Sequence, residues 1–592
     1  MSIKLAKTAG FCMGVRRAIT LVLERASKNP EGKNIYTLGP LIHNNQALEI
    51  LRSKNIKVLK NLSEFDNGVI AIRAHGITPQ LREKIIEKGA EICDATCPHV
   101  MRAQSITKKY IDQDYAVIII GDKGHAEVEG LLGFTKGRGY VVESIDDIKN
   151  LPNLKNVCIV AQTTQSGERF DEIVDDIKNR YKNVVVFNTI CNSTFERQKE
   201  TIELAKKVDA MVVVGGKHSA NTKRLVELSQ STGTPTFHIE TAEELNKEIL
   251  NNYEVIGVTA GASTPNWIII NVVDKIDEIQ SIKQPPILQL ITRIARYIVY
   301  SQLSVGIAAV ALTYTCASLQ GIQPLFSYLL ISGFYVFAIN VLNKYFSLKQ
   351  DILNQSTKEL AILPHNAFFL KFKTLLLFAS IIVLLLSLFL SYKLDIVSQV
   401  LLLLAIIGGV FYNLVVFPIK KFLRFKYRKI KDIPGSKDLF MAGAWTTVST
   451  LIPFFHTRFL TISVEKNFNI SLLILASIFS FVLVFIRSIV NDIREIESDF
   501  LVGRETIPIV IGKQNTKILV IVLISGLFGL LFVFGEKNLI PRSISILLIT
   551  ALLLMNTLLL ILKRVLISRV KFDLAIDGQF VILAILIYLS KI

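Results

Sequence analysis

Three cysteines lie in loops where their thiols could perform chemistry. Cys12 lies in GFCMGVRRAI, Cys97 in DATCPHV and Cys191 in NTICNSTFERQ, and each precedes a helical pattern. They are 85 and 94 residues apart, so we infer a threefold pseudo-repeat that brings one thiol per unit to a shared centre. Thiolates at helix N-termini favour a metal ion or an iron–sulfur cluster, and three ligands would leave one iron open for a substrate. The spacing also allows three unrelated buried cysteines, because no CxxC pair is present.

Histidines and small polar residues occupy loops that follow other β-rich runs. The motifs are GPLIHN, RAHG, GHAEVEG, SANT and VTAGAS. One such residue alone is more often structural or a helix cap, but the set together suggests a shared anionic ligand such as a diphosphate. The residues are His43, His75, His125, Ser219, Asn221 and Ser263.

The elements that would position these side chains alternate between strands and helices up to about residue 285. Strand-like runs such as YAVIIIGD, NVCIVAQ and AMVVVGG each lead into a loop and then into a helical pattern. This alternation predicts an α/β fold with parallel sheets, whose functional loops lie at the strand ends. With the three cysteines, it predicts three pseudo-repeated α/β lobes around a central iron–sulfur cluster.

The remainder of the chain has a different composition. Repeated apolar runs, each long enough to cross a bilayer, follow residue 295, and Pro285 and Pro286 separate the two parts. We therefore predict two domains, 1–285 and 286–592, the second an all-α membrane bundle of nine helices. The predicted spans begin near residues 297, 323, 374, 397, 438, 470, 517, 543 and 574.

Charge and cysteine usage indicate the side of the membrane. The N-terminal sequence shows no signal peptide, so we expect residues 1–285 in the cytoplasm, where cysteines serve metal or catalytic roles more often than disulfides. If the first span starts on the cytoplasmic side, the loops on that side carry about 21 Lys and Arg, and the loops on the other side carry about 5. The positive-inside rule expects this difference. Because much of the net charge of +18 lies in these loops, we expect membrane lipid and no nucleic acid as a partner.

The N-terminal motifs, taken in order, resemble the hydroxymethylbutenyl diphosphate reductase family, also called IspH or LytB. The resemblance covers nearly all of residues 1–285. It implies a [4Fe-4S] cluster held by Cys12, Cys97 and Cys191, and electrons supplied by a ferredoxin or flavodoxin. It implies reductive removal of the substrate hydroxyl as water, which gives isopentenyl and dimethylallyl diphosphates.

The same resemblance assigns roles around the cluster. Glu127 would supply the proton to the departing hydroxyl, with Thr163 nearby in the relay. A carboxyl group in such a dry pocket should have a raised pKa. Ala220 stands where relatives can carry a second serine. The diphosphate contact at this position would therefore come from the backbone. The diphosphate contacts it implies are His43, His75, His125, Ser219, Ala220, Asn221 and Ser263.

One predicted inside loop of the membrane half carries clustered acids. Asp492, Glu495 and Asp499 are spaced to share one helix face, which suits either a Mg²⁺ site that bridges phosphates or a solvated acidic helix end. The stretch resembles the second aspartate motif of UbiA-type intramembrane prenyltransferases. The run KDIPGSKDLFMAGAW, with Lys431, Asp432 and Lys437, is similar to that superfamily as well.

The region corresponding to that family's first aspartate motif departs from the pattern. It reads FAINVLNKYFSLKQDILN, with Asn340 and Asn343, and the nearest carboxylate is Asp351. Asparagine is a weaker Mg²⁺ ligand than aspartate, so the membrane half is either an altered prenyltransferase or a domain with another role. Asp577 is an acid within the last span, which suggests function or interhelical bonding.

The sequence thus favours a bifunctional isoprenoid enzyme with an oxidoreductase half and a possible prenyltransferase half. The alternative is a membrane-tethered iron–sulfur redox sensor without turnover. The presence of Glu127 and Thr163 argues against it, since a sensor needs the cluster but not the proton relay.

Overall fold

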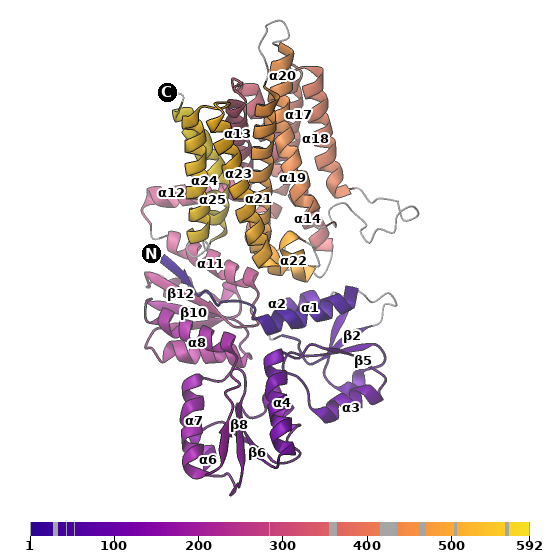
Figure 1. Cartoon of the computed structure of the whole chain (residues 1–592), viewed down its shortest axis with the longest axis vertical. Coiled ribbons are helices and arrows are strands. Elements are labelled where there is room, and N and C mark those ends of the chain that lie inside the picture. The colour runs from indigo at the N-terminus through magenta and orange to yellow at the C-terminus, as the bar shows by residue number, and fades with distance from the viewer. Residues whose placement is uncertain are drawn as a thin grey trace. The chain divides into compact units, whose positions relative to one another are not determined.

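The computed structural model describes residues 2–27, 34–42, 44–52, 54–250, 252–282, 284–353, 364–414, 433, 435–460, 469–502, 506–562 and 568–590. The chain forms two compact units, Met1–Gln280 and Ser281–Ile592. Figure 1 shows strands and helices in the first unit and helices in the second.

The first unit contains three four-stranded sheets, and the strands that pair in them are parallel. The strand orders are β3-β2-β4-β5, β7-β6-β8-β9 and β11-β10-β12-β1. The strands are β1 (Ser2–Leu5), β2 (Ile35–Leu38), β3 (Ile56–Leu59), β4 (Val69–Ile72), β5 (Glu91–Asp94), β6 (Ala116–Ile120), β7 (Gly139–Val142), β8 (Val157–Ala161), β9 (Val184–Val186), β10 (Ala210–Val214), β11 (Thr236–Ile239) and β12 (Val255–Ala260).

The three sheets repeat one connection pattern. In each, the first strand of the repeat pairs with the second on one side and with the third on the other, and the fourth pairs with the third. The third lobe takes its fourth strand, β1, from the start of the chain. The predicted pseudo-repeat is therefore present in the topology, and the carboxyl end of the N-terminal strand becomes equivalent to those of β5 and β9.

Helices cover both faces of these sheets, as the lobe around β6 and β8 illustrates (Figure 1). Alternate residues of β6 point to opposite faces: Ile118 packs with Phe170 and Ile173 of α7, whereas Val117 packs with Ala103 of α4. This burial on both faces explains why the strands read as continuous apolar runs. The α-helices of the unit are α1 (Met13–Ser27), α2 (Asn45–Arg52), α3 (Pro79–Glu87), α4 (Pro98–Asp112), α5 (Ala126–Leu132), α6 (Ile145–Ile148), α7 (Gly167–Arg180), α8 (Asn192–Ala205), α9 (Ala220–Gln230), α10 (Lys247–Leu250) and α11 (Asn266–Ser281).

The second unit is a helical bundle around one large apolar core. Its helices are α12 (Pro286–Tyr300), α13 (Leu303–Leu319), α14 (Phe326–Leu353), α16 (Pro364–Lys371), α17 (Lys373–Ser391), α18 (Ile396–Leu414), α19 (Ser436–Thr446), η4 (Thr447–Leu451), α20 (Ile452–Leu460), α21 (Ile470–Val502), α22 (Ile507–Val510), α23 (Lys513–Glu536), α24 (Arg542–Leu562) and α25 (Arg569–Leu589).

Within the described residues, five helices are long and apolar enough to cross a membrane, or six if a bent pair counts as one span. That pair is α12 and α13, which meet at 80°, where Gln302 adopts a left-handed conformation with φ of 71°. The first span predicted near residue 297 is thus broken. Two further apolar segments, Ile396–Tyr412 and Arg542–Leu553, are shorter, so nine spans stay a prediction.

Candidate active site

The three cysteines occupy equivalent positions in the three lobes. Cys12 lies between β1 and α1, Cys97 between β5 and α4, and Cys191 between β9 and α8. Cys97 and Cys191 are the N-cap residues of their helices, and the Cys12 carbonyl accepts a hydrogen bond from Arg16 N at 3.0 Å. All three thiols therefore lie at helix N-termini, where N–H groups stabilise thiolates.

A repeated hydrogen bond fixes the backbone of each cysteine. Each cysteine N–H donates to a carbonyl in the loop that follows the third strand of its own lobe. The pairs are Cys12 with Ala262 (3.1 Å), Cys97 with Ala74 (2.9 Å) and Cys191 with Thr163 (3.0 Å). Each cysteine loop is thereby tied to a loop that carries a predicted proton-relay or diphosphate residue.

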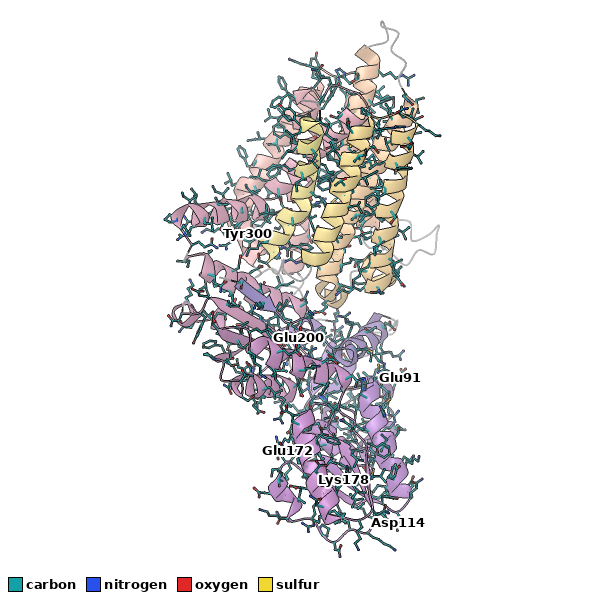
Figure 2. All side chains as sticks on the ribbon, turned by 60° about the vertical axis from the view of Figure 1, so that its left-hand side comes forward. Glu91, Asp114, Glu172, Lys178, Glu200 and Tyr300 are labelled. Atoms are coloured by element: carbon teal, nitrogen blue, oxygen red, sulfur yellow. The ribbon has the colours of Figure 1, made fainter. Side chains whose placement is uncertain are left out.

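Helix α8 links Cys191 to the Cys12 loop. The Glu200 carboxylate, labelled in Figure 2, accepts hydrogen bonds from Lys7 N at 2.7 Å and from Thr8 N at 2.8 Å. On the same helix, the Arg197 guanidinium donates to Gly10 O at 2.9 Å. The segment leading to Cys12 is thus anchored to the helix that Cys191 caps, which couples the positions of the two thiols.

The three thiols are close enough to affect one another electrostatically. Burial raises the pKa of the Cys97 thiol, the N–H groups of His99 and Val100 oppose that rise, and the Cys12 and Cys191 thiolates add to it. A Cβ atom on Gly14 would lie 2.7 Å from Cys97 Sγ and 3.9 Å from Cys12 Sγ, so the absent side chain leaves room beside both sulfurs.

Among the described residues, no group of three or more His, Cys, Asp or Glu side chains could hold a metal ion. Iron–sulfur clusters interpose several irons and sulfides between their cysteine ligands.

Glu127 and Thr163 form the pair that the sequence predicted. Glu127 is 1% exposed, and its carboxylate accepts hydrogen bonds from Thr163 N at 2.7 Å and from Thr163 Oγ1 at 2.8 Å. Burial raises the pKa of Glu127 to about 7, against the opposing effect of both Thr163 hydrogen bonds. This carboxyl group can therefore hold a proton near neutral pH and release it to a bound molecule.

His125 and His75 lie side by side, and His125 is the N-cap of the helix that carries Glu127. Their ring centroids are 5.4 Å apart in an edge-on arrangement. His125 Nδ1 accepts a hydrogen bond from Glu127 N at 3.2 Å, which assigns the proton of the neutral ring to Nε2. Burial lowers the pKa of His125, Asp122 opposes this, and the Arg73 guanidinium adds to it. A neutral His125 can donate from Nε2 to an anion.

The third lobe presents buried polar atoms that have no hydrogen-bond partner in the part of the chain that the structure describes. Asn221 is 6% exposed and Ser263 is 8% exposed. Among the described residues, both amide atoms of Asn221 and the Ser263 hydroxyl have no hydrogen-bond partner. Because buried polar groups are normally satisfied, such atoms indicate a polar ligand.

Ser219 and Ala220 begin the helix that carries Asn221. The Ser219 hydroxyl caps α9 by accepting from Thr222 N at 3.4 Å, which leaves its O–H proton available. Ala220 is the first residue of α9. A Cβ atom on Gly215 would lie 2.7 Å from Thr264 Oγ1 and 2.8 Å from Thr222 Oγ1, so the Asn221 and Ser263 loops pack together.

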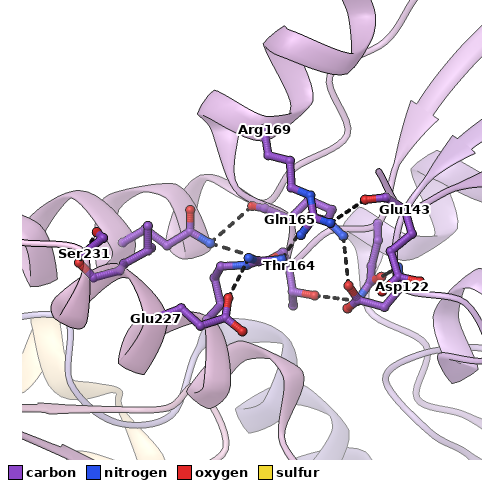
Figure 3. Close-up of polar contacts among 11 residues, drawn as sticks. Asp122, Glu143, Thr164, Gln165, Arg169, Glu227 and Ser231 are labelled. Atoms are coloured by element: carbon purple, nitrogen blue, oxygen red, sulfur yellow. Dashed lines mark hydrogen bonds and ion pairs between the residues drawn. The ribbon is translucent and has the colours of Figure 1, made fainter. Parts of the chain in front are cut away.

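A polar network holds the loop that carries Thr163 (Figure 3). The Asp122 carboxylate accepts from Gln162 Nε2 at 3.2 Å and from Gln165 Nε2 at 3.3 Å. Gln165 O accepts from Gln198 Nε2 of α8 at 3.2 Å. The Thr163 loop is therefore tied to the strand end before His125 and to the helix that Cys191 caps.

In the membrane half, the predicted acidic helix face is part of an ion-pair network. Asp492 and Asp499 are buried in α21, and Lys437 Nζ of α19 lies 2.8 Å from Asp492 Oδ1. Asp438 accepts a hydrogen bond from the Ser488 hydroxyl, and its Oδ2 atom has no hydrogen-bond partner within the described part of the chain. Glu495 instead pairs with Arg569 Nη2 at 2.9 Å.

The other predicted polar residues of this half have mixed positions. Asn340 donates from Nδ2 to Val336 O at 2.8 Å within its own helix, and Asn343 lies on the same helix, α14. Asp577 forms a buried ion pair with Arg487 at 2.7 Å, which corresponds to interhelical bonding. His43, Lys431 and Asp432, and the side chain of Asp351, lie outside the described residues.

Comparison with known proteins decides the family of the first unit. Residues 3–277 match the family described as LytB protein. A relative from Alkaliphilus oremlandii, named 4-hydroxy-3-methylbut-2-enyl diphosphate reductase, is 44% identical over 280 residues, which are 47% of this chain and 100% of the relative. The chain belongs to the LytB family. Its N-terminal half is thus homologous to an oxidoreductase over that enzyme's whole length.

Further comparisons concern both halves. A reductase structure from Plasmodium falciparum aligns with 48% of this chain, and the alignment includes 89% of the Plasmodium chain, at 30% identity and a TM-score of 0.45. Residues 304–572 match the UbiA prenyltransferase family. The structure of a UbiA homologue from Archaeoglobus fulgidus, described as bound to DMAPP and Mg²⁺, aligns with 49% of this chain. The alignment includes 98% of the Archaeoglobus chain, at 16% identity and a TM-score of 0.34. The UbiA match and the apolar helices indicate a membrane protein.

Two residues near these sites were missed by sequence reasoning. Arg73 of the LytB domain lies close enough to His125 to affect its pKa, and a Cβ atom on Gly39 would lie 2.8 Å from Arg73 Nη1. An arginine directly after the buried strand β4 was the available signal. Asp438 is 1% exposed, and a carboxylate in the first turn of the apolar helix α19 could have identified it.

Proposed function

We propose that residues 1–280 reduce 4-hydroxy-3-methylbut-2-enyl diphosphate to isopentenyl and dimethylallyl diphosphates. The reaction takes up two electrons and two protons, breaks the bond between carbon and the hydroxyl oxygen, and releases water. Cys12, Cys97 and Cys191 would hold a [4Fe-4S] cluster, which supplies the electrons one at a time when a ferredoxin or flavodoxin reduces it.

The chain's own residues would bind the substrate and move the proton. The Asn221 amide, the hydroxyls of Ser219 and Ser263 and Nε2 of His125 suit the oxygens of a diphosphate, since each can donate a hydrogen bond. His43 and His75 are proposed to contribute as well. Glu127 would then give its proton to the departing hydroxyl, and Thr163 keeps its carboxyl group in place.

The observation that carries this proposal is the buried Glu127–Thr163 pair, and the Asn221 and Ser263 atoms that have no hydrogen-bond partner among the described residues support it. A redox sensor without turnover needs only the thiols, so the rival function leaves this pair without a purpose. Glu127→Gln should keep the cluster absorption of anaerobically reconstituted protein and lose most turnover. A near-normal rate in this variant would remove Glu127 from the mechanism.

For the membrane half, we propose prenyl transfer, with Mg²⁺ bound by Asp492 and Asp499. The family match and the burial of both carboxylates support this assignment. Asp492→Asn should abolish Mg²⁺-dependent transfer in membranes incubated with a prenyl diphosphate and a panel of acceptors, while reductase turnover is unchanged. Transfer that survives this substitution would contradict the assignment.

We also propose that residues 1–280 face the cytoplasm, because electron donors such as ferredoxin and flavodoxin are found there and because positive charge is enriched in the inside loops. A membrane-impermeant thiol reagent applied to intact cells should leave the N-terminal cysteines unlabelled. The same reagent should label them after the membrane is opened.

A further inference from the structure

Helix α12 has an apolar face that the bundle leaves exposed. Large aliphatic side chains recur on it every three or four residues, so they share one side of the helix. They are between 47% and 74% exposed, and a contiguous exposed patch of this kind marks a surface that contacts a partner or a membrane. We call this surface the α12 apolar face, and its residues are Ile287, Leu290, Ile291 and Ile294.

The opposite face of α12 is polar and lies against the chain that enters the helix. Gln289 Nε2 donates hydrogen bonds to the carbonyl groups of Ile282 and Gln284, at 2.8 Å each. Arg293 and Arg296 follow Gln289 at helical spacing and share its side of the helix. The sequence of α12 contains no acidic residue. The helix is therefore both amphipathic and positively charged.

The last turn of α12 shows where this helix meets the bundle. Val299 and Tyr300 pack with Val570, which is the second residue of α25. Because α25 is one of the helices long and apolar enough to cross a membrane, its end marks the depth at which acyl chains give way to headgroups. Arg569 and Lys571 flank Val570, and basic side chains are common at that boundary. Helix α12 thus joins the bundle at the membrane surface.

The direction of α12 differs from that of the bundle helices. It meets α13 at 80°, and α13 packs against α14 and α25. In Figure 2, α12 runs outward from Tyr300, across the direction of the bundle helices. A helix that leaves the end of a span at nearly a right angle runs along the membrane surface and does not cross it.

We propose that α12 is an interfacial helix that lies in the surface of a bilayer and binds anionic lipid. The α12 apolar face enters the boundary between headgroups and acyl chains, as amphipathic helices of this composition do. Arg293 and Arg296 bind lipid phosphates from the polar side, since guanidinium groups match phosphate oxygens. Membrane attachment of this kind does not depend on the activity of either half.

Lipid suits this face better than a second copy of the chain. Exposed apolar side chains continue from α12 into α13, at Leu303 and Ile307, and α13 belongs to the membrane bundle. The positive charge of α12, with no acidic residue to offset it, attracts an anionic lipid surface and repels an identical helix.

Tryptophan fluorescence of the full chain in vesicles tests the position of the helix. Ile291→Trp places the probe on the α12 apolar face, and Thr292→Trp is the matched control on the polar side. Lipids brominated on the acyl chain should quench the emission added by Ile291→Trp at least about threefold more strongly than that added by Thr292→Trp. Ile287→Trp, at the most exposed position of the face, replaces Ile291→Trp if that variant aggregates.

The same probe tests the choice of lipid. At equal mole fraction, brominated phosphatidylglycerol should quench Ile291→Trp at least about twofold more strongly than brominated phosphatidylcholine, because each arginine near an anionic surface favours the charged lipid. Arg293→Gln together with Arg296→Gln should abolish that preference. Lys393→Gln removes an exposed charge between α17 and α18 and should leave it unchanged.

Three results would overturn the proposal. Equal quenching of Ile291→Trp and Thr292→Trp would show that the apolar face does not enter the bilayer. An unquenched Ile291→Trp in a chain that sediments as a dimer would assign the face to a second copy. Equal quenching by the two brominated lipids would remove the arginines from lipid binding.

Discussion

At the scale of single residues, burial and hydrogen bonding act on Glu127 in opposite directions. Burial disfavours the anion, whereas both hydrogen bonds from Thr163 favour it, and the result is a pKa of about 7. The protonated form predominates below that pH. Protonation also stabilises the folded state relative to the unfolded one, so this contribution is lost as pH rises from about 4.5 to about 7.

Turnover of the reductase should therefore fall as pH rises above about 7, by about tenfold per pH unit once Glu127 is largely ionised. The measurement is a pH–rate profile, together with infrared detection of the protonated carboxyl band. Glu127→Gln should lose that band and show a low, nearly pH-independent rate. A band that persists in the Gln variant would belong to another carboxyl group.

At the scale of elements, the site depends on helices whose N-termini converge, and Gly14 in the first turn of α1 permits this. A Cβ atom there would lie 2.7 Å from Cys97 Sγ, closer than van der Waals contact allows. Gly14→Ala should displace the Cys97 thiol, and reconstituted protein should lose iron to a chelator at least about tenfold faster than the unsubstituted chain.

Gly167→Ala is the matched control. Gly167 is also in a first helical turn, but its Cβ atom would lie 3.4 Å from the nearest Phe195 atom, so the neighbouring ring can accommodate it. Iron retention in this variant should equal that of the unsubstituted chain. Equal retention in Gly14→Ala would show that the α1 terminus does not constrain the cluster.

At the scale of the whole molecule, the two units have separate cores, and the twelve strands of the described structure end by Ala260. A chain of residues 1–280 keeps these strands and all three cysteine loops, so it should fold and bind its cluster alone. Its reductase turnover should lie within about twofold of that of the full chain. Gel filtration, iron analysis and an activity assay would check this.

An aggregated or iron-free product from the shortened chain would contradict this independence. If both forms have equal activity in solution, the value of the fusion would lie in co-localisation at the membrane. Severing the chain after residue 280 in cells and measuring isoprenoid flux would test that value, and unchanged flux would mean that the fusion has no kinetic purpose.

The sequence by itself determined the α/β character and the loops that carry the three cysteines, and the resemblance to the LytB family implied the Glu127–Thr163 pairing. These depend on local signals: apolar runs buried on both sheet faces, glycine-rich loops at strand ends and a motif order that resembles the LytB family. It also indicated the membrane half, since apolar runs of bilayer length are visible in composition alone. The count of nine spans stays a prediction, since the described helices give five or six, and hydropathy did not show the break at Gln302.

Only the tertiary structure decided which distant residues act on one another. It placed β1 as the fourth strand of the third lobe, which makes the Cys12 loop equivalent to the other two. It brought Arg73 to His125 and paired Asp577 with Arg487. Such contacts join residues far apart along the chain, so periodicity and composition carry no information about them, and the sum of charges at one place exists only after the elements have packed.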